Sequence, residues 1–207
     1  MITLHHLNKS RSKRIIWLLE ELGLDYQIKA YQRDSQTFLA PPELKAIHPL
    51  GKSPVIEYDQ QVIAESGAIT EYLIDTHAAG ILAPEKGTTE YVEYLQWMHF
   101  AESSAILPLL LRMFVAKDGC LTNFLEGYAA AETEKVLSHV NQSLEGKRYL
   151  VADKLTGADI MMSFIVELLS QSGEVKKYPH IAAYAQQLSQ HENSTKASQI
   201  EQEYDNS

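Results

Sequence analysis

The order of strand and helix signals in the first thirty residues constrains the fold most strongly. Residues 2–6 alternate between side-chain types and predict a strand. Apolar residues then recur at helical spacing from about residue 11–13 to 22, and Gly23 stands where a helix C-terminal glycine belongs. Residues 26–31 alternate again and predict a second strand. A strand–helix–strand unit of this kind pairs its strands in parallel through a right-handed crossover.

The next fifty residues add two strands and a helix. Residues 55–58 and 62–64 predict strands joined by a hairpin turn, and a helix opens at residues 65–67. The hairpin adds antiparallel pairs to the parallel pair. The sequence therefore predicts a mixed four-stranded sheet with helices packed on it, close to the thioredoxin architecture.

Beyond a linker at residues 76–88, the sequence shows helical spacing and no strand pattern. Pro108 is expected to kink or split the first of these helices. We expect two domains, an α/β domain at residues 1–79 and an all-helical bundle at residues 88–207. The tail from about residue 192 is polar and is expected to be disordered.

The composition excludes several classes of function. The chain has 207 residues and a net charge of −9, which argues against nucleic acid as a partner because phosphate binding needs a basic surface. No apolar run approaches the roughly 20 residues that span a bilayer, so no membrane partner is expected. The single cysteine, Cys120, excludes an internal disulfide, and the histidines show no metal-ligand spacing. A cytoplasmic location fits this cysteine usage.

The stretch from His48 to Ile56 reads as a turn that feeds a short strand, with Pro54 at the strand entry. If the Ser53–Pro54 bond is cis, Ser53 turns its backbone N–H and C=O outward, where they could pair with an extended peptide. The plainer alternative is a trans proline at a strand start, with no ligand.

Glu65 and Ser66 stand at the predicted junction of a strand and a helix. A helix N-terminus carries free N–H groups and partial positive charge, so it holds carboxylates well. Ser66 could donate to a carboxylate and Glu65 could accept from an ammonium group, which together suit the zwitterionic end of an amino acid. The plainer alternative is that Ser66 is a helix cap and Glu65 a solvated acid.

The loop of residues 8–12, continued by Lys13 and Arg14, is basic inside an acidic protein. It follows the first strand and opens the first helix, the sheet edge where open α/β folds bind ligands. A hydroxyl here, helped by the helix dipole, could hydrogen-bond a thiol and favour its thiolate. One of Ser10 and Ser12 is expected to cap the helix; Ser10, further back in the loop, is better placed to be free.

Taken together, these residues resemble the glutathione S-transferase family over nearly the whole chain, up to about residue 190. Residues 48–54 resemble the turn before the family's cis-proline, and residues 65–66 resemble its γ-glutamyl-binding pair. Residues 155–160 resemble the capping box and hydrophobic staple of its C-terminal domain. The opening, residues 10–23, is similar to bacterial and fungal members of the serine-type or divergent branch.

The resemblance implies a glutathione site. Ser53, ahead of a cis Pro54, pairs its backbone with the cysteinyl unit of glutathione, and Lys52 approaches the glycyl carboxylate. Glu65 and Ser66 take the γ-glutamyl amino and carboxylate groups. Glutathione is thus a co-substrate, and no metal is implied.

The resemblance also implies a group that stabilises the glutathione thiolate, and Ser10 is assigned that catalytic role. Because the loop differs in length among classes of the family, Asn8, Arg11 and Ser12 remain alternatives. Residues 4–7 contain no tyrosine and the loop contains no cysteine, so tyrosine-type and cysteine-type chemistry are not expected.

The implied reaction is the conjugation of glutathione to small apolar electrophiles in detoxification, by a homodimer. Trp97, Phe100 and Met113 could line the electrophile cleft. Three other readings stay open: glutathione-dependent peroxide reduction, glutathione-dependent disulfide reduction without a protein thiol, and a non-catalytic or regulatory protein that works through protein contacts.

Overall fold

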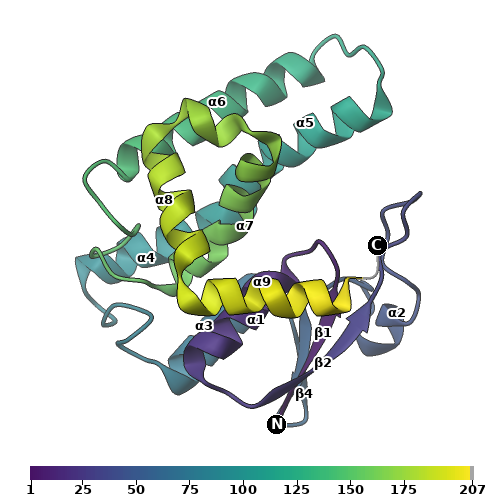
Figure 1. The fold of residues 1–207 in the computed structure, drawn as a ribbon, viewed down its shortest axis with the longest axis vertical. Helices are drawn as coiled ribbons and strands as arrows, with labels where there is room; N and C mark the ends of the chain where they lie inside the picture. Colours follow the sequence, from purple (N-terminus) through teal and green to yellow (C-terminus); the bar gives the residue numbers. More distant parts are fainter. Residues whose placement is uncertain (206–207) are drawn as a thin grey trace. The chain divides into compact units, whose positions relative to one another are not determined.

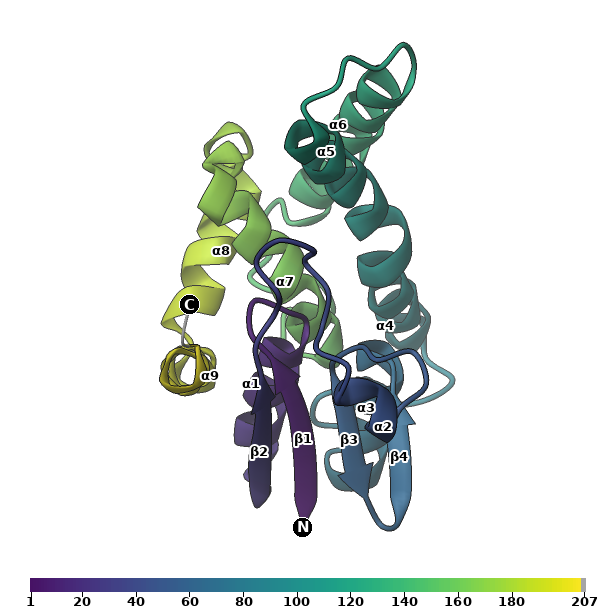
Figure 2. The ribbon, with the colours of Figure 1, turned by 90° about the vertical axis from the view of Figure 1, so that its right-hand side faces the viewer.

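The computed structural model describes residues 1–205. Its N-terminal unit contains a four-stranded sheet in the order β2-β1-β3-β4 (Figures 1 and 2). The strands are β1 (Ile2–Leu7), β2 (Tyr26–Tyr31), β3 (Val55–Tyr58) and β4 (Gln61–Ala64). β1 pairs in parallel with β2, whereas β3 is antiparallel to both β1 and β4. The predicted mixed sheet is therefore confirmed.

Three helices accompany this sheet: α1 (Ser12–Leu22), α2 (Leu44–Ile47) and α3 (Ser66–His77). Alternation along β1 sends consecutive side chains to opposite faces. His6 contacts Ser12 at the start of α1, whereas Leu7 packs in a buried cluster with Leu44 of α2. α1 and α2 therefore cover opposite faces, and the end of β1 meets both.

The C-terminal unit is all-helical in the described residues, as predicted. Its elements are α4 (Thr89–Phe100), the π-helical segment η1 (Ala101–Ala105), α5 (Ile106–Asp118), α6 (Leu125–Ser143), α7 (Gly157–Ser172), the 3-10 helix η2 (Glu174–Lys177) and α8 (Pro179–Gln190). The expected split at Pro108 lies just before it, in η1. Pro108 has no N–H for the carbonyl of Ser104, four residues earlier within η1, and this loss favours a break there.

The continuous helical stretch Thr89–Asp118 is long and apolar enough to cross a membrane, judged by length and composition alone. The mean hydropathy of its most apolar segment is 1.2, and 28% of that segment is buried. No such stretch was expected, because no apolar run in the sequence approaches the roughly 20 residues that span a bilayer. One such helix is weak evidence for insertion, since the same length and hydropathy occur in helices of proteins that enter no membrane.

Residues 192–204 of the tail are helical, which corrects the expectation of disorder there, and residues 206–207 lie outside the described residues. Residues Glu192–Tyr204 form helix α9, which packs along α1 (Figure 1). The chain from Ser189 onward thus joins the unit Met1–Ala83, while Pro84–Leu188 forms the other unit. The domain that we expected to continue from residue 88 to the C-terminus therefore ends near Leu188.

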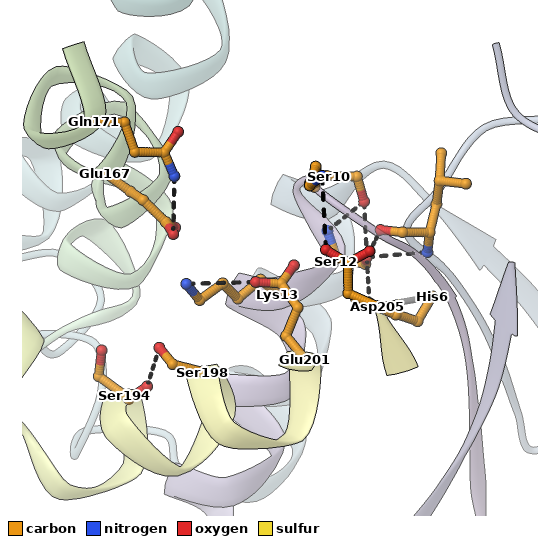
Figure 3. Close-up of polar contacts among 12 residues, drawn as sticks. His6, Ser10, Ser12, Lys13, Glu167, Gln171, Ser194, Ser198, Glu201 and Asp205 are labelled. Carbon is orange, nitrogen blue, oxygen red and sulfur yellow. Dashed lines mark hydrogen bonds and ion pairs between the residues drawn. The ribbon is translucent and has the colours of Figure 1, made fainter. Parts of the chain in front are cut away.

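Polar contacts hold α9, which is why hydrophobic spacing did not reveal it. Lys196 pairs with Glu20 (2.5 Å), and Glu201 pairs with Lys13 (3.4 Å, Figure 3). The Gln32 amide donates to the carbonyl of Tyr204 (2.6 Å). Only Ala197 is buried in this helix. A helix attached by ion pairs and hydrogen bonds leaves little apolar periodicity in its sequence.

Candidate functional site

The sheet register brings the three predicted segments to one edge. Val55 pairs with both His5 of β1 and Ala64 of β4. The residues just before β3, just after β1 and just after β4 therefore lie at neighbouring positions. These are Ser53–Pro54, the loop of residues 8–12, and Glu65–Ser66, in that order. The sheet thus positions every segment to which a glutathione role was assigned.

Ser53 joins the β3 entry to the end of β1. The Ser53–Pro54 bond is cis, and Pro54 is buried. The Ser53 hydroxyl donates to the carbonyl of His5 (2.8 Å) and accepts from the N–H of Leu7 (3.1 Å). Within residues 1–205, the backbone N–H and C=O of Ser53 have no hydrogen-bond partner. They are available to pair with an extended peptide, as predicted for a cis bond.

Lys52 follows a tight turn at Gly51. Gly51 has φ +57°, and a Cβ there would lie 2.7 Å from the Cγ of Lys45. Glycine is therefore required at this position, both for its backbone conformation and for the side-chain approach. Lys52 is exposed and directly precedes Ser53.

Glu65 and Ser66 form the junction of β4 and α3. Glu65 has φ +68° and ψ +117°, and its side chain makes no capping bond to the helix. A non-glycine residue at positive φ costs of order 1–3 kcal/mol and is typical of ligand-binding positions. Ser66 is buried, and it lies inside α3 as the first helical residue. The reading of Ser66 as a plain helix cap is therefore wrong.

A buried arginine, whose role the sequence analysis did not find, lies beside Ser66. Arg14 is only 2% exposed, and its guanidinium donates to the Ser66 hydroxyl (3.4 Å). It adds positive charge to the N-terminus of α3, which already favours anions. The signal was available, because Arg14 stands one turn before Leu18 on the apolar stripe of α1.

The four side chains considered for thiol chemistry differ in their surroundings. Asn8 is held at both ends: its amide donates to Asp205 (3.0 Å), and its carbonyl accepts from the Arg33 N–H (2.7 Å). Ser12 is fully buried, and its hydroxyl donates to the carbonyl of Leu7 (3.1 Å).

Ser10 is 6% exposed and accepts from the N–H of Ser12 (3.2 Å), while Arg11 is half-buried. The N-cap residue of α1 is Arg11, so neither serine is the N-cap, although the Ser10 hydroxyl binds the N–H of the first helical residue. Ser10 is the least buried of Asn8, Ser10 and Ser12.

His6 lies directly beneath this loop. Its side chain is fully buried, and its Nδ1 lies 2.7 Å from the Ser12 hydroxyl (Figure 3). Desolvation lowers the pKa of His6 from 6.5 to about 4, although the negative charge of Asp205 opposes this shift. His6 is therefore neutral at pH 7.

The buried His6 makes the fold sensitive to acid. Because its folded-state pKa lies below the unfolded value, stability is fully present above about pH 6.5 and is lost as the pH falls toward 4. This group alone is expected to cost roughly 3 kcal/mol of unfolding free energy over that range. Urea unfolding at pH 7 and pH 4 checks this. His6→Phe should lose less stability than the wild type, and equal losses would contradict the assignment.

Two of the pockets formed by the described residues lie in the helical unit. One has a volume of about 400 Å³ and is lined by Phe100, His139 and neighbours on α5 and α6. The other has a volume of about 670 Å³ and is lined by Met113, Leu168 and other side chains of α5, α6 and α7. The three residues that were predicted to line one electrophile cleft therefore do not line one pocket. Trp97 is buried against Phe100 and His139, and Phe100 and Met113 line different pockets.

Among residues 1–205, no group of histidine, cysteine, aspartate or glutamate side chains is arranged to hold a metal ion. Cys120 is a free, exposed thiol on the loop between α5 and α6. The sheet edge therefore offers hydroxyl, amide and charged groups for binding a ligand.

A unit with a thioredoxin-like mixed sheet, followed by an all-helical unit, is shared with known proteins. Residues 1–75 match the N-terminal domain of glutathione S-transferases, and residues 125–192 match the C-terminal domain. Glutathione S-transferase 3 of Schizosaccharomyces pombe is 34% identical over 79% of this chain and 72% of its own. Glutathione S-transferase 1 of Saccharomyces cerevisiae is 31% identical over 93% of this chain and 92% of its own.

A solved structure indicates the same family. The crystal structure of a glutathione S-transferase from Actinobacillus pleuropneumoniae is 40% identical in sequence, with a TM-score of 0.88. The similarity covers 98% of this chain and 93% of that chain. This chain therefore belongs to the glutathione S-transferase family and is an enzyme of that family. The predicted family and the predicted fold class are confirmed.

Proposed function

We propose that this enzyme binds glutathione at the sheet edge and conjugates it, through its sulfur, to small apolar electrophiles. The observation that carries the proposal is the meeting of the Ser53 backbone, the Glu65–Ser66 junction and the Ser10 loop at one edge. The Ser53 N–H and C=O suit the cysteinyl peptide groups of glutathione, as in the addition of a strand.

The two ends of glutathione find charged partners. Ser66, with Arg14 and the N-terminus of α3, suits the γ-glutamyl carboxylate, and Glu65 suits the γ-glutamyl ammonium group. Lys52, exposed beside Ser53, suits the glycyl carboxylate.

Ser10 is the group that we assign to the sulfur, because it reaches the surface while Ser12 and Asn8 are committed within the protein. Its hydroxyl donates to the thiolate once the thiol proton has passed to solvent. The sulfur then forms a bond to the electrophilic carbon, and the leaving group departs with the electron pair.

Replacing Ser10 tests the catalytic assignment. Ser10→Ala is expected to lower the rate of conjugation of glutathione to an activated aryl halide at pH 6.5 by about 10- to 100-fold. Glutathione affinity, measured by calorimetry, should change little, because the tripeptide contacts remain. Ser35→Ala, at an exposed serine of the same unit, is the matched control.

The alternatives give different outcomes in the same experiment. Conversion of an organic hydroperoxide to its alcohol with formation of glutathione disulfide would add a peroxidase activity. Binding of glutathione without turnover of halide, peroxide or disulfide would favour a non-catalytic protein of the same fold. An Ser10→Ala enzyme with wild-type rates would move the role to Arg11 or another loop group.

We also propose a homodimer in the cytoplasm. Exposed apolar side chains on α4 and α5 support a subunit contact, since Val92, Leu107 and Phe114 are each 54% exposed. The single exposed thiol, Cys120, suits a reducing compartment.

A further inference from the structure

Three side chains form a hydrogen-bonded chain from the sheet interior to the thiol-binding loop. His6 Nδ1 lies 2.7 Å from the Ser12 hydroxyl oxygen, and that oxygen lies 2.8 Å from the Ser10 hydroxyl oxygen (Figure 3). His6 and Ser12 are fully buried, and Ser10 is 6% exposed. Only the last member of the chain reaches the surface.

The Ser12 hydroxyl has four hydrogen-bonding neighbours, more than it can bind at the same time with one hydrogen and two lone pairs. Its oxygen lies near His6 Nδ1, Ser10 Oγ, the Leu7 carbonyl (3.1 Å) and the Leu7 N–H (3.3 Å). A hydroxyl has one hydrogen to donate and two lone pairs to accept with. Toward Ser12, the Leu7 N–H can only donate and the Leu7 carbonyl can only accept. The directions of the two remaining bonds depend on each other.

The tautomer of His6 decides those directions. If Nδ1 carries the hydrogen, His6 and the Leu7 N–H fill the two lone pairs of Ser12. Ser12 then cannot accept from Ser10. It points its own hydrogen between the Ser10 oxygen (2.8 Å) and the Leu7 carbonyl (3.1 Å), so the Ser10 hydrogen stays available for an external acceptor. If Nε2 carries the hydrogen instead, Ser12 gives its only hydrogen to Nδ1. It then has a lone pair open, which draws the Ser10 hydrogen inward and leaves the Leu7 carbonyl without that bond.

The surroundings of Nε2 favour the first arrangement. His6 Nε2 is buried and has no hydrogen-bond partner anywhere in residues 1–205. A buried N–H without a partner is rarer in proteins than a buried acceptor without one. Placing the hydrogen on Nδ1, where Ser12 accepts it, avoids the orphan donor. The low pKa of His6 keeps the ring neutral at pH 7, so one nitrogen only is protonated.

We propose that His6, as the neutral Nδ1–H tautomer, is a positioning residue that acts through Ser12 to leave the Ser10 hydrogen free for the glutathione sulfur. This inference rests on the proposed function, because it presumes that Ser10 donates to the thiolate. His6 itself touches neither glutathione nor the electrophile. It sets the direction of the hydrogen bond between Ser12 and Ser10.

The tautomer is measured directly on the wild-type protein. Long-range ¹H–¹⁵N correlation spectra of ¹⁵N-histidine-labelled protein at pH 7 distinguish a protonated Nδ1 from a protonated Nε2 in each ring. His6→Phe identifies the His6 signals by their loss. We expect the Nδ1–H pattern for His6. An Nε2–H pattern would overturn the proposal, whatever the variants show.

Two variants of His6 then test the functional consequence. Asn can present its amide N–H to Ser12 as Nδ1 does, whereas Phe fills the space without a donor. His6→Phe is expected to raise the pKa of the bound glutathione thiol by about one unit toward the free value of about 8.5. His6→Asn should stay close to the wild type. Both should bind S-methylglutathione, which has no thiol proton, with wild-type affinity.

The failure of this inference is distinguishable from failure of the proposed function. A wild-type thiol pKa that Ser10→Ala raises, but that His6→Phe leaves unchanged, overturns the role of His6 alone. A wild-type enzyme with an unshifted thiol pKa overturns the thiolate site itself. In the double variant with Ser10→Ala, His6→Phe should add no further shift, because both changes remove the same hydrogen bond. An additive shift would indicate a merely structural effect.

Discussion

Asp159→Ala is expected to destabilise the helical unit by about 4 kcal/mol, which is close to the whole stability of a marginal domain. Asp159 is fully buried at the N-terminus of α7. Its carboxylate accepts from the N–H of Leu150 (3.0 Å), the N–H and hydroxyl of Thr156 (2.9 and 3.1 Å) and the hydroxyl of Tyr184 (2.8 Å). Truncation leaves these buried donors without an acceptor, at about 1–3 kcal/mol for each unsatisfied group.

Urea unfolding followed by circular dichroism measures this loss. Asp25→Asn, at an exposed aspartate, is the matched control and should lie within about 0.5 kcal/mol of the wild type. Asp159→Asn keeps the side-chain size but faces the Thr156 N–H with an amide, so an intermediate loss is expected. If Asp159→Ala unfolded within 1 kcal/mol of the wild type, the capping box would not have the structural role that we give it.

The second large effect concerns the binding of glutathione itself. Ser66→Ala and Glu65→Gln are each expected to weaken glutathione binding by about 1–3 kcal/mol, or roughly 5- to 150-fold in Kd. Ser66→Ala removes a donor to the γ-glutamyl carboxylate and leaves the Arg14 guanidinium without that hydroxyl. Glu65→Gln removes the charge opposite the ammonium group but keeps the side-chain length.

Calorimetric titration with glutathione provides both values. Thr76→Ala is the matched control, because Thr76 lies exposed on the same helix, and its hydroxyl donates only to the carbonyl of Tyr72. Titration with γ-glutamylcysteine, which lacks the glycyl unit, should show the same losses, since the γ-glutamyl end is unchanged. Unchanged affinity in both variants would remove the γ-glutamyl end from the N-terminus of α3.

The sheet and its binding edge were predictable because local signals agree with the tertiary fold. The alternation of side-chain types predicted β1 and β2, and the positions of proline and glycine predicted the turn before β3. The segments of the site were predictable for the same reason, since each directly precedes or follows a strand. Their roles came from the resemblance to a family, because the residues alone left plainer readings open at Ser53, Glu65 and Ser66.

The parts that could not be predicted depend on contacts between residues far apart in the sequence. α9 is held by Lys196 and Gln32, whose partners lie more than 170 residues away along the chain, and no period in a polar segment indicates such contacts. The Ser10–Ser12 link and the burial of His6 depend on how β1 packs against α1. A histidine pair on a strand indicates only that the two rings face opposite ways.

The thiolate absorbance of glutathione bound to the wild-type enzyme, followed in the ultraviolet against pH, tests the central claim most directly. The account predicts saturable binding and a bound-thiol pKa well below the free value of about 8.5. It also predicts that Ser10→Ala shifts this pKa back toward 8.5 while glutathione remains bound. Bound glutathione that titrates at the free value in the wild type, or no binding at all, would contradict the thiolate site at this sheet edge.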